Sequence, residues 1–398
     1  MSSLSELNII LGVTGSISAY KSLTLASRLT QSGANVTVIL TEGGAEFITP
    51  LSFKAITQNN VVTDSFDVNS KYSVNHVYLG KTADMVVVYP ATANSIAKLA
   101  LGICDNPLAT TILSTTAPVA IAPAMESNMY SHSSTTSNLS ILQSTGVSII
   151  GPEEGSLASG ASGIGRLTEP DDALQYIKFI LGKTKGDLQG KKILITAGGT
   201  QEPVDPVRIL TNLSSGKMGY ALAEAARDRG AKVTLISAPV ALPSPIGVDL
   251  VKIKTANDML KAVQKEIKVN DAIIMAAAVA DYQPSQSANN KIKKDENALQ
   301  IELSPTPDIL KSIQNEPIIK IGFAAETDNL INNAKNKIKT KNLNLIVAND
   351  VTLPGSGFGS DQNQVSIIDK NLNVQTIELA SKYDVSNKIL NALHKLLP

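Results

Sequence analysis

The chain has 398 residues, of which 43% are hydrophobic, and its 35 lysines and arginines balance 35 aspartates and glutamates. This apolar content excludes a disordered chain, and the zero net charge argues against a protein that holds nucleic acid or an anionic membrane by a basic surface. The single cysteine, the lack of a signal-peptide pattern and the lack of an apolar run of about 20 residues predict a cytoplasmic protein without disulfides.

Short apolar runs alternate with stretches of helical period, which is the pattern of βαβ units and parallel sheets. A chain of this length is expected to form two such domains. In the first half, strands are predicted at 8–12, 36–40, 85–89, 119–122 and 147–150, and helices at 19–31 and 96–101. In the second half, strands are predicted at 192–196, 232–237 and 272–276, and a helix at 219–229.

The boundary between the domains is predicted from composition. Residues 182–191 are rich in Gly, Lys and Asp and have no apolar period, which is typical of a linker. We therefore expect one domain at 1–181 and a second at 192–398.

Two further stretches lack a regular pattern. Residues 151–170 are small and flexible around Ser159, and they are expected to form either a surface loop or a lid over a site. Residues 281–295 contain a basic run at 291–294, for which we expect a solvated, charged segment.

Ligands of parallel sheets bind beyond the carboxyl ends of the strands. Residues 12–18 form a Gly-rich turn there, and its backbone N–H groups and serine hydroxyls suit a phosphate, although a tight turn needs glycine anyway. The next strand is followed by Thr41, where an NAD-binding fold would carry an acidic residue, so a nicotinamide-dependent oxidoreductase is disfavoured. After the third strand, Asn94 and Ser95 are expected either to cap a helix or to contact a ligand.

Four motifs follow one another in order along the first half: Gly12-x-Thr14-Gly15-Ser16-Ile17, Pro90-x-Thr92-Ala93-Asn94, Gly102-x-Cys104-Asp105-Asn106 and Pro123-Ala124-Met125. Together they resemble the flavin-dependent cysteine decarboxylases, which bind FMN in a doubly wound, flavodoxin-like α/β domain. The resemblance implies a catalytic role for His76, which precedes the third strand. It also implies FMN contacts from Gly15, Ser16, Ile17, Thr41, Thr92, Asn94, Cys104, Asp105 and Asn106.

Two positions depart from the pattern of that family. Met125 and Glu126 lie where members of that family bind substrate. Those members carry asparagine at the position of Glu126, and an ionised glutamate there would repel the substrate's carboxylate. Glu126 is compatible with decarboxylation if it is protonated, turned away or paired with a cation. Ser159 lies where related enzymes have a cysteine that donates a proton, and a serine hydroxyl is a far weaker acid than a thiol. Either another acid donates that proton, or decarboxylation is altered, or the domain binds FMN only as an assembly scaffold.

The densest motif of the chain runs from 195 to 219, where a Gly-rich turn leads to a helix start with Asn, Ser and Gly at 212–216. Such donors bind phosphate or carboxylate groups, although they would also suffice for a capped helix behind an ordered loop. Small residues at 276–280 would let a ligand approach the backbone closely. Asp281, which follows them, is suited to hold Mg²⁺ or a hydroxyl group.

This second half resembles the phosphopantothenoylcysteine synthetases, ligases that join 4'-phosphopantothenate to cysteine. The resemblance implies a second doubly wound, Rossmann-like domain with a mainly parallel sheet. It implies an acyl-nucleotide intermediate formed from CTP, with ATP left open, and Mg²⁺ on the nucleotide phosphates. Asn212 would bind the activated acyl group, Lys291 would stabilise the transferring phosphate, and Asp281 would contact the nucleotide and the metal. Substrate contacts are implied at Ser214, Ser215 and Gly216, and nucleotide contacts at Ala276, Ala277, Asp281, Lys291, Pro307, Asp308, Ile309, Phe323, Lys337 and Lys341.

In relatives that fuse the two halves in this order, the chain is a bifunctional enzyme of coenzyme A biosynthesis. The first half then decarboxylates the ligation product, 4'-phosphopantothenoylcysteine, to 4'-phosphopantetheine. The resemblance also implies a homo-oligomer with trimeric flavin domains and dimeric ligase domains, which combine into a dodecamer.

Overall fold

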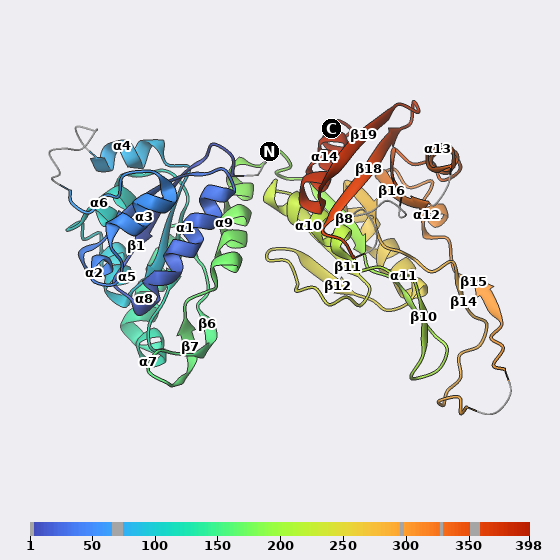
Figure 1. Ribbon diagram of the computed structural model, residues 1–398, viewed down its shortest axis with the longest axis horizontal. Helices are drawn as coiled ribbons and strands as arrows, with labels where there is room; N and C mark the ends of the chain where they lie inside the picture. Colours follow the sequence, from blue (N-terminus) through green and yellow to red (C-terminus); the bar gives the residue numbers. More distant parts are fainter. Residues whose placement is uncertain (1–3, 66–74, 295–297, 327–328, 351–358) are drawn as a thin grey trace. The chain divides into compact units, whose positions relative to one another are not determined.

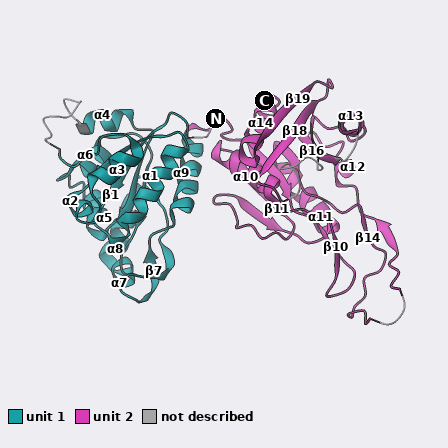
Figure 2. Ribbon diagram, in the orientation of Figure 1, with its two compact units in different colours: residues 1–184 teal, residues 185–398 magenta. Residues whose placement is uncertain are grey.

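The computed structural model describes residues 4–65, 75–294, 298–326, 329–350 and 359–398. The chain divides into two compact units, Met1–Thr184 and Lys185–Pro398 (Figure 2). No helix in the described part of the chain is long and apolar enough to cross a membrane.

The end of the first unit differs from the expected linker at 182–191. Helix α9 (Pro170–Lys185) continues through the first four of those residues. It does so because Ile177, Leu181 and Gly182 are buried along one face, four or five residues apart. The sequence 182–185 is therefore the last turn of a packed helix.

The first unit contains one five-stranded sheet in the order β2-β1-β3-β4-β5, and every neighbouring pair is parallel. These strands are β1 (Asn8–Val13), β2 (Asn35–Leu40), β3 (Met85–Ala91), β4 (Val119–Pro123) and β5 (Ser148–Ile149). The order is that of the flavodoxin-like doubly wound fold, in which the crevice opens between β1 and β3. The predicted fold class of this half is confirmed.

Helices cover both faces of this sheet (Figure 1). They are the 3-10 helix η1 (Ile17–Tyr20), α1 (Lys21–Gln31), α2 (Glu42–Ala45), α3 (Pro50–Thr57), α4 (Asn75–Thr82), α5 (Ala93–Leu101), α6 (Pro107–Ser114), α7 (Ser127–Ser131), α8 (Ser133–Ser144) and α9. Alternate strand residues enter two separate cores, as the two-residue period of a strand requires. In β1, Ile9 and Leu11 pack with α1 and α9, whereas Ile10 packs with α5 and α6.

A β-hairpin stands where an irregular loop or lid was expected. Strands β6 (Glu153–Ser156) and β7 (Ser162–Arg166) pair antiparallel, and Ser159 lies in the turn between them. Glycines interrupt the alternation of side chains that would have indicated a strand. Gly165 is one of them, and a Cβ there would lie 2.2 Å from the carbonyl oxygen of Met125.

The second unit contains an eight-stranded sheet in the order β12-β11-β8-β13-β16-β17-β18-β19. Its strands are β8 (Lys192–Ala197), β11 (Lys232–Ser237), β12 (Asp249–Lys252), β13 (Ala272–Met275), β16 (Ile319–Glu326), β17 (Leu345–Asp350), β18 (Gln362–Asp369) and β19 (Val374–Ser381). The first six strands in that order are parallel, and β18 and β19 add an antiparallel edge. The parallel part follows the order of dinucleotide-binding folds, whose crevice opens between the first strand, β8, and the fourth, β13. The predicted Rossmann-like, mainly parallel sheet is confirmed.

The other elements of the second unit are helices around the sheet and two hairpins that project from it (Figure 1). The helices are α10 (Lys217–Asp228), α11 (Ala256–Glu266), the 3-10 helix η2 (Ile267–Val269), α12 (Ile309–Ser312), α13 (Leu330–Thr340) and α14 (Lys382–His394). The hairpins pair β9 (Gln201–Pro203) with β10 (Ile209–Thr211), and β14 (Tyr282–Pro284) with β15 (Leu303–Pro305).

Candidate functional sites

In the first unit, the segments that follow β1, β2 and β3 meet at the carboxyl edge of the sheet. The Thr14 hydroxyl donates to the carbonyl of Pro90 at 2.8 Å and accepts the N–H of Thr92 at 3.1 Å. The Thr41 hydroxyl donates to the carbonyl of Val13 at 3.1 Å. Gly15 allows the close approach of the first two turns, because a Cβ there would lie 2.9 Å from the backbone of Gly43. Hydroxyl groups thus bridge the backbone segments at the edge where the crevice is expected.

Three hydroxyls at this edge of the sheet also cap helix starts. Ser16 accepts the N–H of Ser18 at 3.3 Å, Thr41 accepts that of Gly44 at 3.2 Å, and Thr92 accepts that of Ser95 at 3.3 Å. The cap of α5 is therefore Thr92, and the expectation that Asn94 and Ser95 cap this helix is wrong because both lie inside its first turn.

Residues Asn94 and Ile17 are exposed at this edge. Exposed N–H groups at helix starts, hydroxyl groups and an exposed aliphatic side chain are a donor set that fits the phosphate, ribityl chain and ring of FMN.

The predicted contacts at 104–106 lie elsewhere in this unit. They follow the far end of α5, whose nine residues separate them from Thr92 by about 13 Å. Asn106 caps α6 through the N–H groups of Leu108 and Ala109, while Cys104 is exposed. The hydrogen bond from Lys98, 2.6 Å long, lowers the pKa of the exposed Asp105. Within one chain, the structure does not bring these residues to the crevice.

The segment Met125–Glu126 leads into α7 and contacts the hairpin. The Met125 N–H donates to the carbonyl of Gly165 at 3.0 Å. The Glu126 carboxylate accepts the N–H of Asn128 at 2.6 Å and caps α7, so it is turned towards its own helix. Ser159 is exposed at the hairpin tip, where its hydroxyl accepts the N–H of Ala161 at 3.4 Å. His76 lies in the first turn of α4, and its carbonyl accepts the hydroxyl of Ser114 at 2.9 Å.

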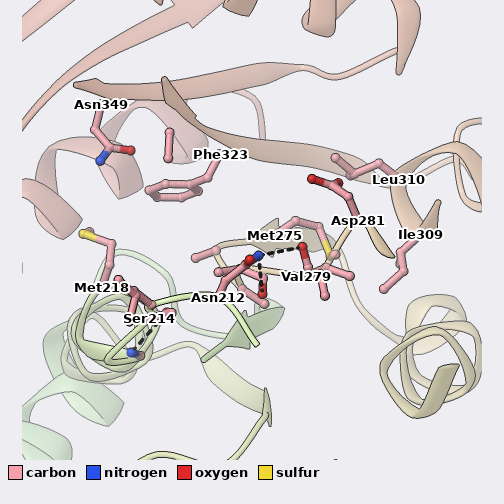
Figure 3. Close-up of a pocket in the computed structure, with 18 of the residues that line it drawn as sticks. Asn212, Ser214, Met218, Met275, Val279, Asp281, Ile309, Leu310, Phe323 and Asn349 are labelled. Carbon is pink, nitrogen blue, oxygen red and sulfur yellow. Dashed lines mark hydrogen bonds between the residues drawn. The ribbon is translucent and has the colours of Figure 1, made fainter. Parts of the chain in front are cut away.

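The second unit has a cavity of about 840 Å³ along the carboxyl ends of β13, β16 and β17 and the start of α10 (Figure 3). Most of the residues predicted for this half line it. These are Asn212, Ser214, Ser215, Gly216, Ala276, Ala277, Asp281, Pro307, Asp308, Ile309, Phe323, Lys337 and Lys341.

One wall of the cavity is the loop after β13, which neighbouring hydroxyls hold in place. Thr196 accepts the N–H of Ala277 at 3.1 Å, and Thr200 accepts that of Ala280 at 2.9 Å. The amide of Asn212 donates to the carbonyls of Val279 at 3.1 Å and Ala278 at 3.4 Å. Figure 3 shows Asn212 in the middle of the cavity, between Ser214 and Asp281.

Two lysines at the end of α13 are tied to the opposite side of the cavity. Lys337 donates to the carbonyl of Phe323 at 3.1 Å, and Lys341 forms an ion pair with Asp308. Burial alone would raise the pKa of Asp308, but the Lys341 ammonium and the N–H of Lys311 lower it below its usual value. This side therefore carries a fixed carboxylate and two ammonium groups.

Lys291 is exposed and does not line the cavity. Its neighbour Ile292 donates an N–H to the buried carboxylate of Asp205 at 3.1 Å, and its carbonyl accepts from Arg208 at 2.6 Å. Burial alone would raise the pKa of Asp205, but hydrogen bonds from Arg208, Val207 and Ile292 hold it well below its usual range. The expected solvated run is thus anchored in part to the hairpin β9–β10.

Sequence reasoning missed several polar residues of the cavity wall, namely Lys217, Asn349, Asn363 and Lys382. Lys217 directly follows the predicted 212–216 segment, so the motif itself could have indicated that this lysine lies at the site. The others enter from the end of β17, from β18 and from the start of α14, which no local pattern connects with the motif. No cluster of three or more His, Cys, Asp or Glu side chains that could hold a metal ion occurs in the described ranges.

Comparison with known proteins matches each half to a family. Residues 1–182 match the flavoprotein family, and residues 188–397 match the family described as DNA/pantothenate metabolism flavoprotein, C-terminal domain. A solved C-terminal domain of a coenzyme A biosynthesis bifunctional protein is 42% identical, covers 53% of this chain and 98% of its own, and superposes with a TM-score of 0.46.

Full-length relatives carry both halves. The coenzyme A biosynthesis bifunctional protein CoaBC of Bacillus subtilis is 45% identical over 99% of this chain and 98% of its own length. That of Escherichia coli is 41% identical over 97% of this chain and 100% of its own length. The chain therefore belongs to the family of bifunctional coenzyme A biosynthesis proteins, and it is an enzyme with a flavoprotein half that is a phosphopantothenoylcysteine decarboxylase and a second half that is a phosphopantothenate–cysteine ligase.

Proposed function

We propose that the cavity of the second unit binds CTP and 4'-phosphopantothenate side by side and joins the latter to cysteine through an acyl-nucleotide. The observation that supports this most directly is the convergence of the implied substrate and nucleotide residues on one cavity at the β8–β13 crevice. That crevice is where folds of this strand order bind nucleotides.

The reaction needs no nucleophile from the protein. The pantothenate carboxylate attacks the α-phosphorus of CTP, the bond to the β-phosphate breaks, and pyrophosphate leaves. The cysteine amine then attacks the acyl carbon, the amide forms, and CMP leaves with the bonding electron pair while the amine loses a proton. Asn212, held by two backbone carbonyls, is positioned to orient the acyl group, so alignment and charge neutralisation supply the catalysis.

Mg²⁺ is proposed to bind the nucleotide phosphates with Asp281 as its protein ligand. Asp281 is an exposed carboxylate at the cavity wall. This single ligand fits Mg²⁺, which commonly combines one or two carboxylates with phosphate oxygens and waters.

Lys291 is proposed to stabilise negative charge on the transferring phosphate, although its segment is anchored outside the cavity lining. Lys291→Gln should abolish pyrophosphate release and leave the fold unchanged by circular dichroism. A variant with near-normal pyrophosphate release would contradict the role.

In the first unit, we propose that FMN binds in the crevice lined by Gly15–Ile17, Thr41 and Thr92. When bound, FMN supplies the oxidation of the substrate's thiol-bearing carbon that makes its carboxylate easy to lose. The chain's own groups bind and orient the reactants. The capped helix starts bind the FMN phosphate, and the segment Met125–Glu126 together with the hairpin β6–β7 positions the substrate. His76 is proposed to orient the substrate carboxylate or to transfer a proton.

A single incubation tests both activities. Enzyme with FMN receives 4'-phosphopantothenate, cysteine, CTP and MgCl2, and we expect equal amounts of pyrophosphate and CMP, release of CO2, and 4'-phosphopantetheine as product. Accumulation of the amide without CO2 would contradict the proposed decarboxylase site. Pyrophosphate from ATP but not from CTP would contradict the proposed nucleotide.

We also propose that the chain forms a homo-oligomer through both units, with trimeric flavin units and dimeric ligase units. Each unit exposes large aliphatic side chains to solvent, such as Leu51 and Leu113 in the first and Val207 and Leu213 in the second. Light scattering should give a mass that is a multiple of the 41.9 kDa chain. A monomer would contradict the proposal.

A further inference from the structure

The loop after β13 carries Asp281, and side-chain packing alone gives this loop few anchors. Residues 276–280 are four alanines and one valine. Asp281 itself is exposed, and its carboxylate pairs with no side chain among the residues that the structure describes. Figure 3 shows this side chain within the cavity. Hydrogen bonds to the backbone must therefore set where the carboxylate stands.

Two threonine hydroxyls hold Ala280, the residue before Asp281, from opposite sides. Thr200 Oγ1 accepts the N–H of Ala280 at 2.9 Å, and Thr306 Oγ1 donates to the carbonyl of Ala280 at 2.5 Å. The backbone N–H of Thr306 also donates to the carbonyl of Asp281 at 2.9 Å. Three backbone groups of residues 280 and 281 are thus bonded to the same two threonines.

The two threonines come from separate segments of the cavity wall. Thr200 ends the Gly-rich turn after β8 and is fully buried, and its carbonyl accepts the hydroxyl of Thr211 at 2.8 Å. Thr211 directly precedes Asn212, the proposed acyl contact. Thr306 directly follows β15 and precedes Pro307, where the implied nucleotide contacts begin. The bonds to Ala280 therefore connect the segments proposed to hold the two reactants.

The geometry points to a positioning role: Thr200 and Thr306, here called the threonine clamp, fix the backbone at Asp281 and so place its carboxylate for the nucleotide and its Mg²⁺. This inference rests on the proposed function of the cavity. Mg²⁺ demands near-octahedral ligands at about 2.0–2.1 Å, so a single protein ligand on an exposed side chain needs a fixed backbone. Both hydroxyls are engaged by Ala280, so the clamp acts through Asp281 and not on the reacting atoms.

Two substitutions of Thr200 separate its hydroxyl from its packing. Valine keeps the shape of threonine but removes the acceptor, whereas serine keeps the acceptor and removes a methyl group. Calorimetry on the full-length enzyme in MgCl2 should show CTP binding about tenfold weaker in Thr200→Val, and close to that of the wild type in Thr200→Ser. In EDTA, both variants should bind CTP within about twofold of the wild type. Binding of 4'-phosphopantothenate should be unchanged throughout.

Hydrogen exchange followed by mass spectrometry reads the clamp without any nucleotide. In Thr200→Val, peptides that cover 278–284 should exchange faster, while β8 and β13 keep their wild-type rates and Thr200→Ser keeps the segment slow. Ser237→Ala is the matched control. Ser237 is a buried hydroxyl at the end of β11, bonded to the carbonyl of Ala238 at 2.8 Å, and it does not line the cavity. Its loss should change neither CTP binding nor exchange at 278–284.

Asp281→Asn tests whether the clamp acts through Asp281. This change should itself weaken CTP binding in MgCl2, and Thr200→Val should add no further loss to it, because two changes that remove one interaction are not additive. Thr306→Val, at a less buried position, should reproduce the selective loss if Thr200→Val fails to fold.

The clamp is wrong if the folded threonine variants bind CTP normally in MgCl2, if their defect persists in full in EDTA, or if Thr200→Val weakens binding further in the Asp281→Asn enzyme. Normal CTP binding by Asp281→Asn alone would contradict the proposed role of Asp281, and the clamp with it. A wild-type enzyme that releases no pyrophosphate from CTP contradicts the proposed ligase chemistry, whereas normal release together with any of the first three results overturns the clamp alone.

Discussion

Glu126 shows how one side chain can keep a structural role while opposing a chemical one. Its carboxylate caps α7 through the N–H of Asn128 and is therefore fixed beside the segment that we propose positions the decarboxylase substrate. Of the three arrangements compatible with decarboxylation, the structure shows the carboxylate turned towards its own helix. It nevertheless places a carboxyl group close to the proposed site of an anionic substrate.

Glu126→Asn separates these two effects. Asparagine is among the best N-cap residues, so the start of α7 should be preserved while the charge is removed. We expect the KM for 4'-phosphopantothenoylcysteine to fall by about tenfold, the equivalent of about 1.4 kcal/mol, in a CO2-release assay. The ligation rate of the same preparation is the control. An unchanged or higher KM would mean that Glu126 does not face the substrate carboxylate.

At the scale of elements, strands that are buried on both faces can be predicted from the sequence. A hairpin or a helix cap whose position depends on tertiary contacts cannot. The central strands are continuous apolar runs because both faces are covered, and β1, β2, β8 and β11 lie within one residue of their predicted bounds. The hairpin β6–β7 was not predicted, because its glycines are required by close packing against α7 and they erase the alternation of side chains. Likewise, Thr92 rather than Asn94 or Ser95 caps α5, because its position is set by the Thr14 bridge from another strand.

Gly165→Ala tests the contact between this hairpin and the substrate segment. Gly165 has a φ of 147°, and an added Cβ would lie 2.2 Å from the Met125 carbonyl oxygen, so the two backbones must separate. We expect kcat/KM for decarboxylation to fall by on the order of tenfold to a hundredfold, as for other small displacements of positioning groups. Flavin absorbance and the ligation rate should stay normal. Gly160→Ala, in the same hairpin with no atom within 4 Å of its added Cβ, is the control for the altered backbone preference. Equal effects of the two changes would mean that the Met125 contact is unimportant.

At the scale of the whole chain, topology explains which site residues could be predicted. Motifs that follow successive parallel strands meet at one sheet edge in any doubly wound fold, so the 212–216 segment, Asp281 and Phe323 converge as expected. Lys382 is the first residue of the last helix, α14, and follows the antiparallel strands β18 and β19, which no sequence motif predicts. The segment of Lys291 is held outside the cavity because its neighbour Ile292 donates an N–H to Asp205, 87 residues away in the sequence, and no local pattern encodes that contact.

The two units should respond independently to substitution, because each buried core cluster lies within a single unit. Gly165→Ala should therefore slow decarboxylation, so that the amide accumulates, and leave amide formation unchanged. Distant sites without shared partners are independent within about 0.5 kcal/mol, so the KM for CTP should equal that of the wild-type enzyme within about twofold. Each activity is measured separately, with supplied 4'-phosphopantothenoylcysteine for the second. A CTP KM that moves with Gly165→Ala by more than about twofold would show that the units are energetically coupled, and the separation of cores would then be an incomplete account of how the chain is organised.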